Sequence, residues 1–186
     1  MKKLLAMLCV VAMALCATAC GSSSNSSSSD ANKSYKIGIC QLIQHPALDA
    51  ATKGFKDYLT EKLGDKVSFT EQNAAGDSAI CATICNQFAS DNVDLILSNG
   101  TAALQAAVSA TKTIPILGTS ITDYGSALGI DNWTGTTGAN VSGTTDLAPL
   151  DEQADMINEL YPNSKKVGIL YCSGEPNSKY QATTIT

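Results

Sequence analysis

The chain has 186 residues, of which 16% are charged, and a formal net charge of −5. An acidic chain is poorly suited to bind nucleic acid or an anionic surface, so neither is expected as a partner. Every basic residue is a lysine, which excludes a bidentate arginine clamp for carboxylate or phosphate groups.

The first predicted element is an export signal at residues 1–19. Two lysines precede an apolar run from Leu4 to Ala17, which is too short to span a membrane. The sequence Ala17-Thr18-Ala19-Cys20 resembles the lipobox of bacterial lipoproteins, in which cleavage before the cysteine leaves a thiol that is then acylated. Residues 20–34 are accordingly interpreted as a lipidated Cys20 and a flexible serine-rich linker. The alternative is ordinary secretion with cleavage near Ala19, and either outcome exports the protein.

The rest of the chain alternates between patterns typical of strands and of helices. Runs of apolar and β-branched residues predict strands at residues 35–42, 67–73, 94–98 and 114–119. Apolar residues at helical spacing predict intervening helices at residues 46–63, 78–90 and 101–111. This alternating order implies the α/β class, with a parallel sheet flanked by helices in a Rossmann-like lobe.

A polar, glycine-rich stretch at residues 123–146 follows and has no sustained periodicity. A helix is then expected at residues 149–160 and a fresh strand at residues 166–172, whose sequence repeats the pattern of the first strand. We interpret residues 35–146 as an N-terminal α/β lobe. Residues 147–186 are interpreted as a crossover and the incomplete start of a second, similar lobe.

The candidate binding residues follow the predicted strands, because ligands of open parallel sheets bind beyond the carboxyl ends of the strands. These candidates are Gln41, Asn73, Asp77, Asn99, Gly100, Thr101, Thr119, Ser120, Asp123 and Asp146. The N–H groups of a helix that begins after Gly100, with the neighbouring hydroxyl groups, suit a ligand carboxylate. The three aspartates suit a ligand ammonium group. An amino acid fits both kinds of partner, although the sequence does not demand one.

Several of these residues also have a structural interpretation. Thr101 and Asp77 are suited to cap the helices that follow them. Trp133, Tyr124 and Tyr171 are suited either to stack on an aromatic ligand or to pack within the protein.

The sequence predicts no catalytic residue, no metal site and no cofactor. It contains no dinucleotide-binding glycine motif, no phosphate-binding P-loop and no nucleophile elbow. Cys81 and Cys85 lie four residues apart on one face of a predicted helix, but further ligands are missing nearby. We therefore interpret both cysteines as small core residues.

Ordered motifs extend from the first strand into the last forty residues. They include Ile37-Gly38-Ile39, His45-Pro46-Ala47-Leu48-Asp49-Ala50, Asn73-Ala74-Ala75-Gly76-Asp77, Gly138-Ala139-Asn140-Val141-Ser142-Gly143 and Val167-Gly168-Ile169-Leu170-Tyr171. In these motifs the chain resembles the ABC-transporter substrate-binding proteins that include the tryptophan- and tyrosine-binding lipoproteins. The resemblance adds His45 and Asn140 to the candidate ligand-binding residues, and His45 is equally suited to begin a helix.

The resemblance implies a type I periplasmic-binding-protein fold, in which two lobes close on a small solute. It also implies delivery of that solute, with an aromatic amino acid favoured, to an ABC permease and its ATPase. A monomer, lipid-anchored at the outer face of the cell membrane, is expected. The alternative is an extracellular ligand-sensing domain of a signalling system. Because members of the family are roughly twice the folded length, the second lobe is expected to be truncated at Thr186.

Overall fold

The computed structural model describes residues 33–186 of the chain. The expected export signal, Cys20 and most of the serine-rich linker lie outside the described residues. Within residues 33–186, none of the helices is both long enough and apolar enough to cross a bilayer.

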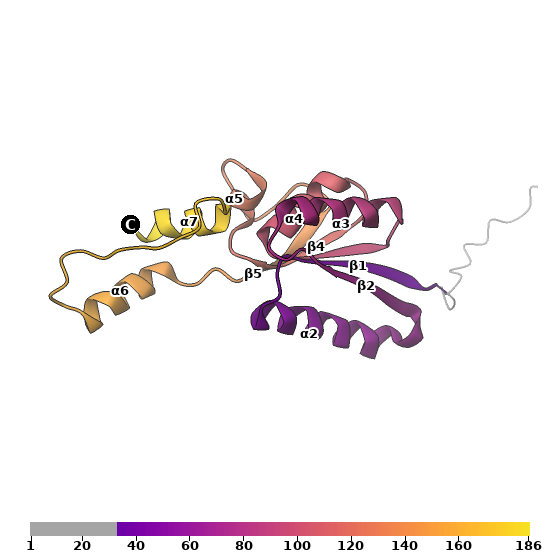
Figure 1. Ribbon diagram of the computed structural model, residues 1–186, viewed down its shortest axis with the longest axis horizontal. Coiled ribbons are helices and arrows are strands. Elements are labelled where there is room, and N and C mark those ends of the chain that lie inside the picture. The colour runs from indigo at the N-terminus through magenta and orange to yellow at the C-terminus, as the bar shows by residue number, and fades with distance from the viewer. Residues whose placement is uncertain (1–32) are drawn as a thin grey trace, which may run out of the picture. The chain divides into compact units, whose positions relative to one another are not determined.

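A parallel sheet of five strands forms the centre of the described residues (Figure 1). The strands are β1 (Tyr35–Gln41), β2 (Val67–Asn73), β3 (Leu95–Asn99), β4 (Ile116–Ile121) and β5 (Val141–Thr145). They lie in the order β2-β1-β3-β4-β5, and each neighbouring pair is parallel. The predicted α/β class with a parallel sheet is therefore confirmed.

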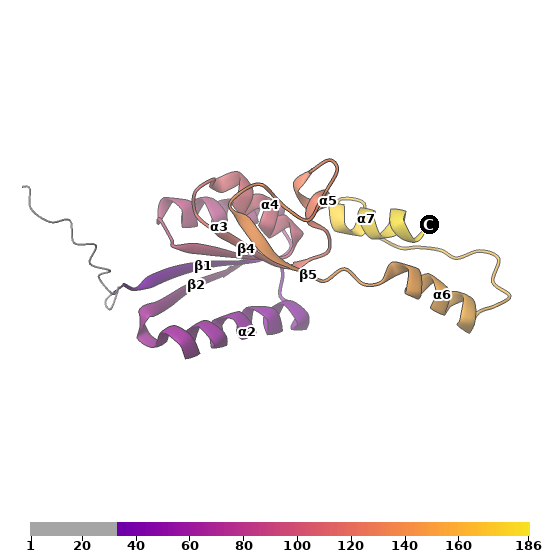
Figure 2. The ribbon, with the colours of Figure 1, turned by 180° about the vertical axis from the view of Figure 1, so that it is seen from behind.

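Helices lie against both faces of this sheet (Figures 1 and 2). The helices of the described residues are α2 (Pro46–Leu63), α3 (Ser78–Ser90), α4 (Thr101–Ala110), α5 (Tyr124–Leu128), α6 (Leu150–Leu160) and α7 (Pro176–Ile185), with a short 3₁₀ turn, η1 (Gly64–Lys66), after α2. Helix α2 covers one face, and α3 and α4 cover the other. Each face thereby acquires its own apolar core.

The two cores meet at the central strands. On the α2 face, Ile39 of β1 and Leu97 of β3 pack with Phe55 of the helix. On the opposite face, Phe88 of α3 and Leu104 of α4 are fully buried. The edge strand β2 is largely exposed, and its partly buried residues are separated by exposed ones, which is typical of a strand covered on one side only.

Strand β4 begins two residues later than the sequence predicts. The hydroxyl oxygen of Thr111 accepts hydrogen bonds from the N–H groups of Thr113 (3.2 Å) and Ile114 (3.1 Å). Pro115 has no N–H group to donate. The ladder therefore starts at Ile116, whose N–H donates to the carbonyl oxygen of Asn140 (2.8 Å).

The glycine-rich stretch contains helix α5 and strand β5, neither of which was predicted. A Cβ atom at Gly143 would lie 2.1 Å from the carbonyl oxygen of Gly118, so β5 approaches β4 too closely for a side chain at this position. Gly143 also has a positive φ of 155°. The close pairing of these backbones requires glycine, and glycine removes the apolar alternation by which a strand is recognised.

The strand predicted at residues 166–172 is absent from the structure, and this prediction was wrong. These residues belong to no ladder and connect α6 to α7 as an irregular segment (Figure 1). Leu170 is fully exposed, and Val167 is 59% exposed. The apolar pattern is that of a strand, but a strand needs a neighbour for its N–H and C=O groups, and the described residues provide none here.

Candidate functional site

Four predicted site residues form a row across four adjacent strands. Gln41 at the end of β1 is paired in register with Asn73 of β2 and with Asn99 of β3. Asn99 is in turn paired with Thr119 of β4. We call Asn73, Gln41, Asn99 and Thr119 the polar row. Because side chains in register on a parallel sheet point to the same face, the polar row lies along one side of the carboxyl ends of the strands.

The polar row crosses the place where the direction of the chain reverses. After β1 the chain passes outward to β2, and after β2 it returns to β3 on the other side of β1. The loops after β1 and β3 therefore leave the sheet in opposite directions. This topological switch point is where open α/β sheets bind ligands, and Gln41 and Asn99 stand on either side of it.

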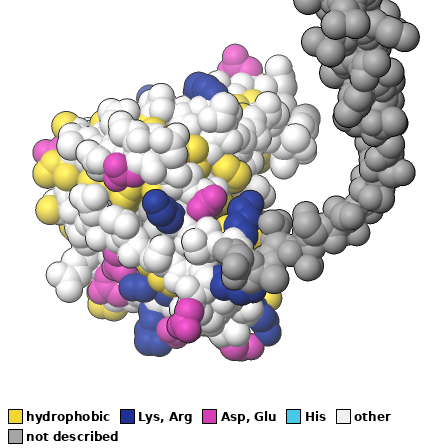
Figure 3. All heavy atoms as spheres, turned by 90° about the vertical axis from the view of Figure 1, so that its right-hand side faces the viewer, with side chains coloured by type: hydrophobic (Ala, Val, Ile, Leu, Met, Phe, Trp, Pro, Cys, Tyr) yellow, Lys and Arg dark blue, Asp and Glu magenta, His cyan; other side chains and the backbone are white. Residues whose placement is uncertain are grey.

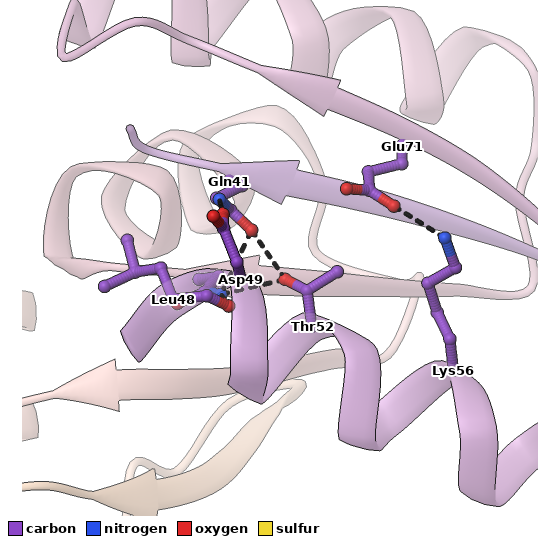
Figure 4. Close-up of polar contacts among 7 residues, drawn as sticks. Gln41, Leu48, Asp49, Thr52, Lys56 and Glu71 are labelled. Atoms are coloured by element: carbon purple, nitrogen blue, oxygen red, sulfur yellow. Dashed lines mark hydrogen bonds and ion pairs between the residues drawn. The ribbon is translucent and has the colours of Figure 1, made fainter. Parts of the chain in front are cut away.

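At the switch point, however, the amides of Gln41 and Asn99 are both engaged within the protein, and Figure 4 shows the contacts of Gln41. Gln41 donates from Nε2 to Oδ1 of Asp49 (2.6 Å) and to the carbonyl oxygen of Ile43 (3.0 Å). Its Oε1 accepts from the hydroxyl group of Thr52 (2.7 Å). Asn99 donates from Nδ2 to the Thr52 hydroxyl oxygen (2.9 Å) and to the carbonyl oxygen of Leu48 (2.8 Å). We call Gln41, Asp49, Thr52 and Asn99 the buried network.

The buried network fixes the first turns of α2 against the ends of β1 and β3. Thr52 and Asn99 are almost completely buried, so these bonds are shielded from solvent. The sequence prediction missed Thr52, although a signal was present: this threonine shares the inward face of the helix with Leu48 and Phe55. Gln41 and Asn99 are consequently better suited to hold the rim of the site than to contact a ligand directly.

Two further candidates begin helices, as their structural interpretation predicts. His45 precedes α2, and its Nδ1 accepts a hydrogen bond from the N–H group of Ala47 (3.2 Å). Asp77 precedes α3, and its carboxylate accepts from the N–H group of Ala79 (2.7 Å). Both side chains are exposed in the loops beyond the carboxyl ends of β1 and β2.

Helix α4 begins without such a side-chain cap. Gly100 precedes it, with φ at 103°, and a Cβ atom there would lie 2.9 Å from Cβ of Leu42. The N–H group of Gly100 donates to the carbonyl oxygen of Thr119 (3.0 Å), which draws the start of α4 toward β4. Thr101 is the first residue of the helix and is 5% exposed. Because glycine has no side chain, the N–H groups of the first turn have no side-chain cap at Gly100.

Strained backbone is present in the loops at these strand ends. Among residues 33–186, four non-glycine residues have a positive φ, and two of them are asparagines, which tolerate this conformation. The other two are Ala75 (51°), in the loop after β2, and Ser120 (56°), near the end of β4. Ser120 also lies at an irregularity in the pairing of β4 with β5. Such strain and such bulges are characteristic of functional sites.

Two aspartates lie beyond the ends of β4 and β5. Asp123 begins α5 and accepts a hydrogen bond from the N–H group of Ser126 (2.6 Å). Asp146 is exposed and donates its own N–H to the carbonyl oxygen of Ile121 (3.0 Å). Burial, and secondarily the charge of Asp146, raise the pKa of Tyr124 to about 12. Negative charge thus lies at this end of the sheet.

The aromatic candidates are used within the protein to different extents. Tyr124 is buried, and its hydroxyl group donates toward the carbonyl oxygens of Gly118 (3.1 Å) and Thr144 (3.3 Å). Trp133 stacks on Tyr124 with ring centroids 6.4 Å apart, and it lines a cavity of about 340 Å³ beside the glycine-rich loop. Tyr124 is therefore a packing residue. Tyr171, in contrast, is 48% exposed.

Asn140 does not join the other candidates. It precedes β5, and its Nδ2 donates to the carbonyl oxygen of Ile114 (2.6 Å), just before β4. Since all strands are parallel, this position is at the amino ends of the strands, opposite the polar row. Asn140 therefore belongs to the connection that brings β5 alongside β4 and lies apart from the other candidates.

The described residues show no metal centre, and the face drawn in Figure 3 carries mixed charges. Among residues 33–186, no three His, Cys, Asp or Glu side chains are arranged to hold a metal ion. Figure 3 shows the face at which β1 begins, and lysine and acidic side chains are interspersed there. Lys56 of α2, for example, pairs with Glu71 of β2 at 2.8 Å.

Comparison with known proteins gives consistent results. A family model described as ABC transporter substrate binding protein matches residues 36–186. The chain is 39% identical over 166 residues to the tyrosine-binding protein of Clostridioides difficile strain R20291. This similarity covers 88% of the chain and 48% of that protein, so the chain spans about half the length of the relative.

Solved structures show the same partial coverage. The ABC domain of Streptococcus pneumoniae in complex with L-Trp is 36% identical, with a TM-score of 0.76, over 82% of this chain and 52% of that chain. A branched-chain amino acid transporter substrate binding protein of the same species, in complex with isoleucine, is 18% identical, with a TM-score of 0.60. It covers 82% of this chain and 45% of the other, and this likeness concerns the fold alone.

Proposed function

Because the chain belongs to the ABC transporter substrate-binding protein family, we propose that it captures a small solute for an ABC importer. An amino acid is the favoured solute, and an aromatic one in particular, since relatives at 36% and 39% identity are described with L-Trp and as tyrosine-binding. These relatives are binding proteins rather than enzymes, and no catalytic step is proposed. The permease and its ATPase are the proposed partners.

One observation carries this proposal: the polar row lies at the switch point of the sheet, flanked by an uncapped helix start and by aspartates. A free amino acid carries one carboxylate and one ammonium group. The N–H groups at the start of α4, with the hydroxyl groups of Thr119 and Ser120, suit the carboxylate. Asp123 and Asp146 suit the ammonium group.

The described residues form one wall of a site. They have the fold of one lobe of type I periplasmic binding proteins, and the chain covers about half of such relatives. We propose that a second lobe supplies the opposite wall, and that closure about a hinge excludes water from the ligand. Water exclusion strengthens each polar contact, so affinity depends on closure.

The location of the protein belongs to the same proposal. Export by residues 1–19 and acylation of Cys20 would hold the folded lobe at the outer face of the cell membrane. Two acyl chains give stable anchoring where one chain gives only reversible binding. The acidic composition contributes nothing to attraction by an anionic membrane, so the acyl chains would provide the whole anchor.

The test is a calorimetric titration of a polypeptide of the relatives' full length that begins with this chain. We expect L-tryptophan, L-tyrosine or L-phenylalanine to bind and to raise the thermal midpoint, with L-lysine and D-tryptophan as matched negative controls. Binding of aliphatic amino acids only would refute the aromatic preference. Absence of binding by all twenty amino acids would refute the amino acid proposal itself.

A further inference from the structure

Three cysteine thiols lie together in the core between the sheet and helix α3. Cys40 is the penultimate residue of β1, and Cys81 and Cys85 lie on successive turns of α3. All three side chains are completely buried in the same apolar cluster. The proposed solute-binding function uses none of them.

The packing of α3 on β1 explains why Cys40 meets both other cysteines. Phe88 of α3 lies directly against Gly38 of β1, where an added Cβ atom would be 2.6 Å from the ring. Cys40 lies two residues further along the strand, about 6.6 Å away at roughly 3.3 Å per residue. Helix α3 runs antiparallel to β1, so this distance corresponds to about four or five residues before Phe88 at 1.5 Å per residue. The level of Cys40 therefore falls between Cys81 and Cys85.

The hydrogen bonds of the cluster distinguish the two helix thiols. The thiol of Cys85 is directed toward helix α4, with its Sγ 3.9 Å from the carbonyl oxygen of Ala103. The neighbouring Cys40 side chain, followed by burial, raises the pKa of Cys81 far above its ordinary value. Because the thiol of Cys85 is directed toward α4, Cys81 is the helix thiol that remains to pair with Cys40.

These surroundings keep the folded cluster unreactive. The side chain of Cys81 acts to lower the pKa of Cys40, but the side chain of Cys85 and burial outweigh it and raise this pKa to about 12. Only thiolates attack disulfides, so the folded cluster does not exchange. Any oxidation of these residues must take place while the lobe is open or still folding.

We propose that Cys40 and Cys81 are a disulfide-forming pair, which closes when the chain folds in the presence of a small-molecule disulfide. The Cys40 thiolate attacks the oxidant RSSR, forms a mixed disulfide and releases RSH. Cys81, after losing its proton, attacks the Cys40 sulfur of this mixed disulfide and releases a second RSH. Two protein thiols are thereby oxidised, and one RSSR is reduced to two RSH. The new bond joins β1 to the first turn of α3.

The pair has a structural consequence that is independent of ligand binding. The bond would close the loop from Cys40 to Cys81, which contains α2 and β2, and would restrict the unfolded chain accordingly. A folded lobe that was never oxidised keeps three buried, unreactive thiols instead. The stability of the lobe would therefore depend on whether an oxidant was present while it folded.

The experiment compares the full chain refolded from denaturant with reduced glutathione alone or with a mixture of reduced and oxidised glutathione. Free thiols are alkylated under denaturing conditions, and tryptic peptides are identified without reduction. We expect the oxidised sample to contain the peptide spanning residues 37–53 linked to the peptide spanning residues 67–112. Elastase, which cleaves after small residues such as Ala82, then assigns the link to Cys81 or Cys85. The expected partner is Cys81.

Matched variants provide a second measurement. Oxidative refolding should raise the thermal midpoint of the parent and of Cys85→Ala, and should leave that of Cys81→Ala unchanged. Circular dichroism of the reduced variants verifies that each one folds. A link from Cys40 to Cys85, the absence of linked peptides, or an equal rise in midpoint for both variants would overturn the proposal.

Discussion

The geometry of the ends of β1 and β3 depends on the side-chain hydroxyl group of Thr52. It donates to Gln41 and accepts from Asn99, and so it joins the two amides that stand at the switch point. Asn99 already has a buried Oδ1 atom with no hydrogen-bond partner among the described residues. Apart from the bonds of Thr52, the two amides are joined only by a long contact of 3.5 Å from Nδ2 of Asn99 to Oε1 of Gln41.

We expect Thr52→Val to lower the free energy of unfolding by about 1–3 kcal/mol, because it leaves buried polar groups unpaired while conserving shape. Thr60→Val on the exposed side of the same helix is the matched control and should change stability little. Urea denaturation followed by circular dichroism measures both. An equal effect of the two substitutions would show that the buried hydroxyl group of Thr52 contributes no more to the free energy of unfolding than the exposed one of Thr60.

Ser120 combines strained backbone with a polar side chain near the proposed ligand. Replacement by glycine relieves a conformation that costs other residues about 1–2 kcal/mol, so Ser120→Gly should not lower stability. Loss of one hydroxyl contact should weaken amino acid binding by about threefold to tenfold. Calorimetric titration of the full-length polypeptide measures this change.

The control for Ser120→Gly is Asn92→Gly. Asn92 has a similar φ of 51° but lies between α3 and β3, at the opposite ends of the strands. Asn92→Gly should leave the affinity for the amino acid unchanged. Equal affinities of the two variants and the parent would place the ligand away from Ser120.

At the scale of elements, the contact between β1 and α3 depends on the missing side chain of Gly38. The ring of Phe88 occupies the space that a Cβ atom would need. Gly54, in the exposed part of α2, provides a contrast, because nothing lies within 4 Å of a Cβ atom built there.

We expect Gly38→Ala to destabilise the lobe by about 1–3 kcal/mol through overpacking. Gly54→Ala should stabilise it by about 0.5–1 kcal/mol, because alanine loses less conformational entropy within a helix. Both are glycine-to-alanine changes measured by the same denaturation curves. A stabilising Gly38→Ala would mean that Phe88 moves aside freely.

The same elements show what the sequence reveals and where it does not suffice. Helices α2 and α3 were predicted with their observed bounds, because His45-Pro46 and Asp77 mark their starts and apolar spacing marks their length. Strand β5 was missed because its pairing depends on backbone contact at Gly143, which leaves no side-chain pattern. Residues 166–172 show the reverse case, in which a strand pattern lacks a neighbouring strand. Strand pairing is decided by distant residues, and a local pattern cannot report it.

For the site, the sequence indicated the correct ends of the strands but not the role of each residue. Gln41 and Asn99 follow apolar runs, which places them at the strand ends. That their amides turn toward Thr52 depends on how α2 lies across the sheet. Asn140 lies at the other ends of the strands, which the sequence did not indicate because the strand that follows it was not recognised.

For residues 33–186 as a whole, the well-paired sheet contrasts with the segment at residues 166–172. The central strands β1 and β3 are paired on both sides and almost fully buried. Residues 166–172 belong to no ladder and expose apolar side chains such as Leu170.

We expect amide hydrogen exchange in the full chain to be slow in β1 and β3 and fast across residues 166–172, since amides outside any ladder exchange without an opening step. Mass spectrometry of peptides from both regions measures the contrast. Strong protection across residues 166–172 would mean that this segment pairs with a strand after all.

The buried network also bears on how the solute specificity of such a protein can change during evolution. Gln41, Thr52 and the amide nitrogen of Asn99 make their hydrogen bonds within the protein, so these groups make no demand on what occupies the space beyond them. Asn73, Thr119 and Ser120 stand further out, on positions that this interior holds in place. Evolution, or a protein engineer, could therefore exchange the outer residues for a new solute while leaving the scaffold beneath them untouched.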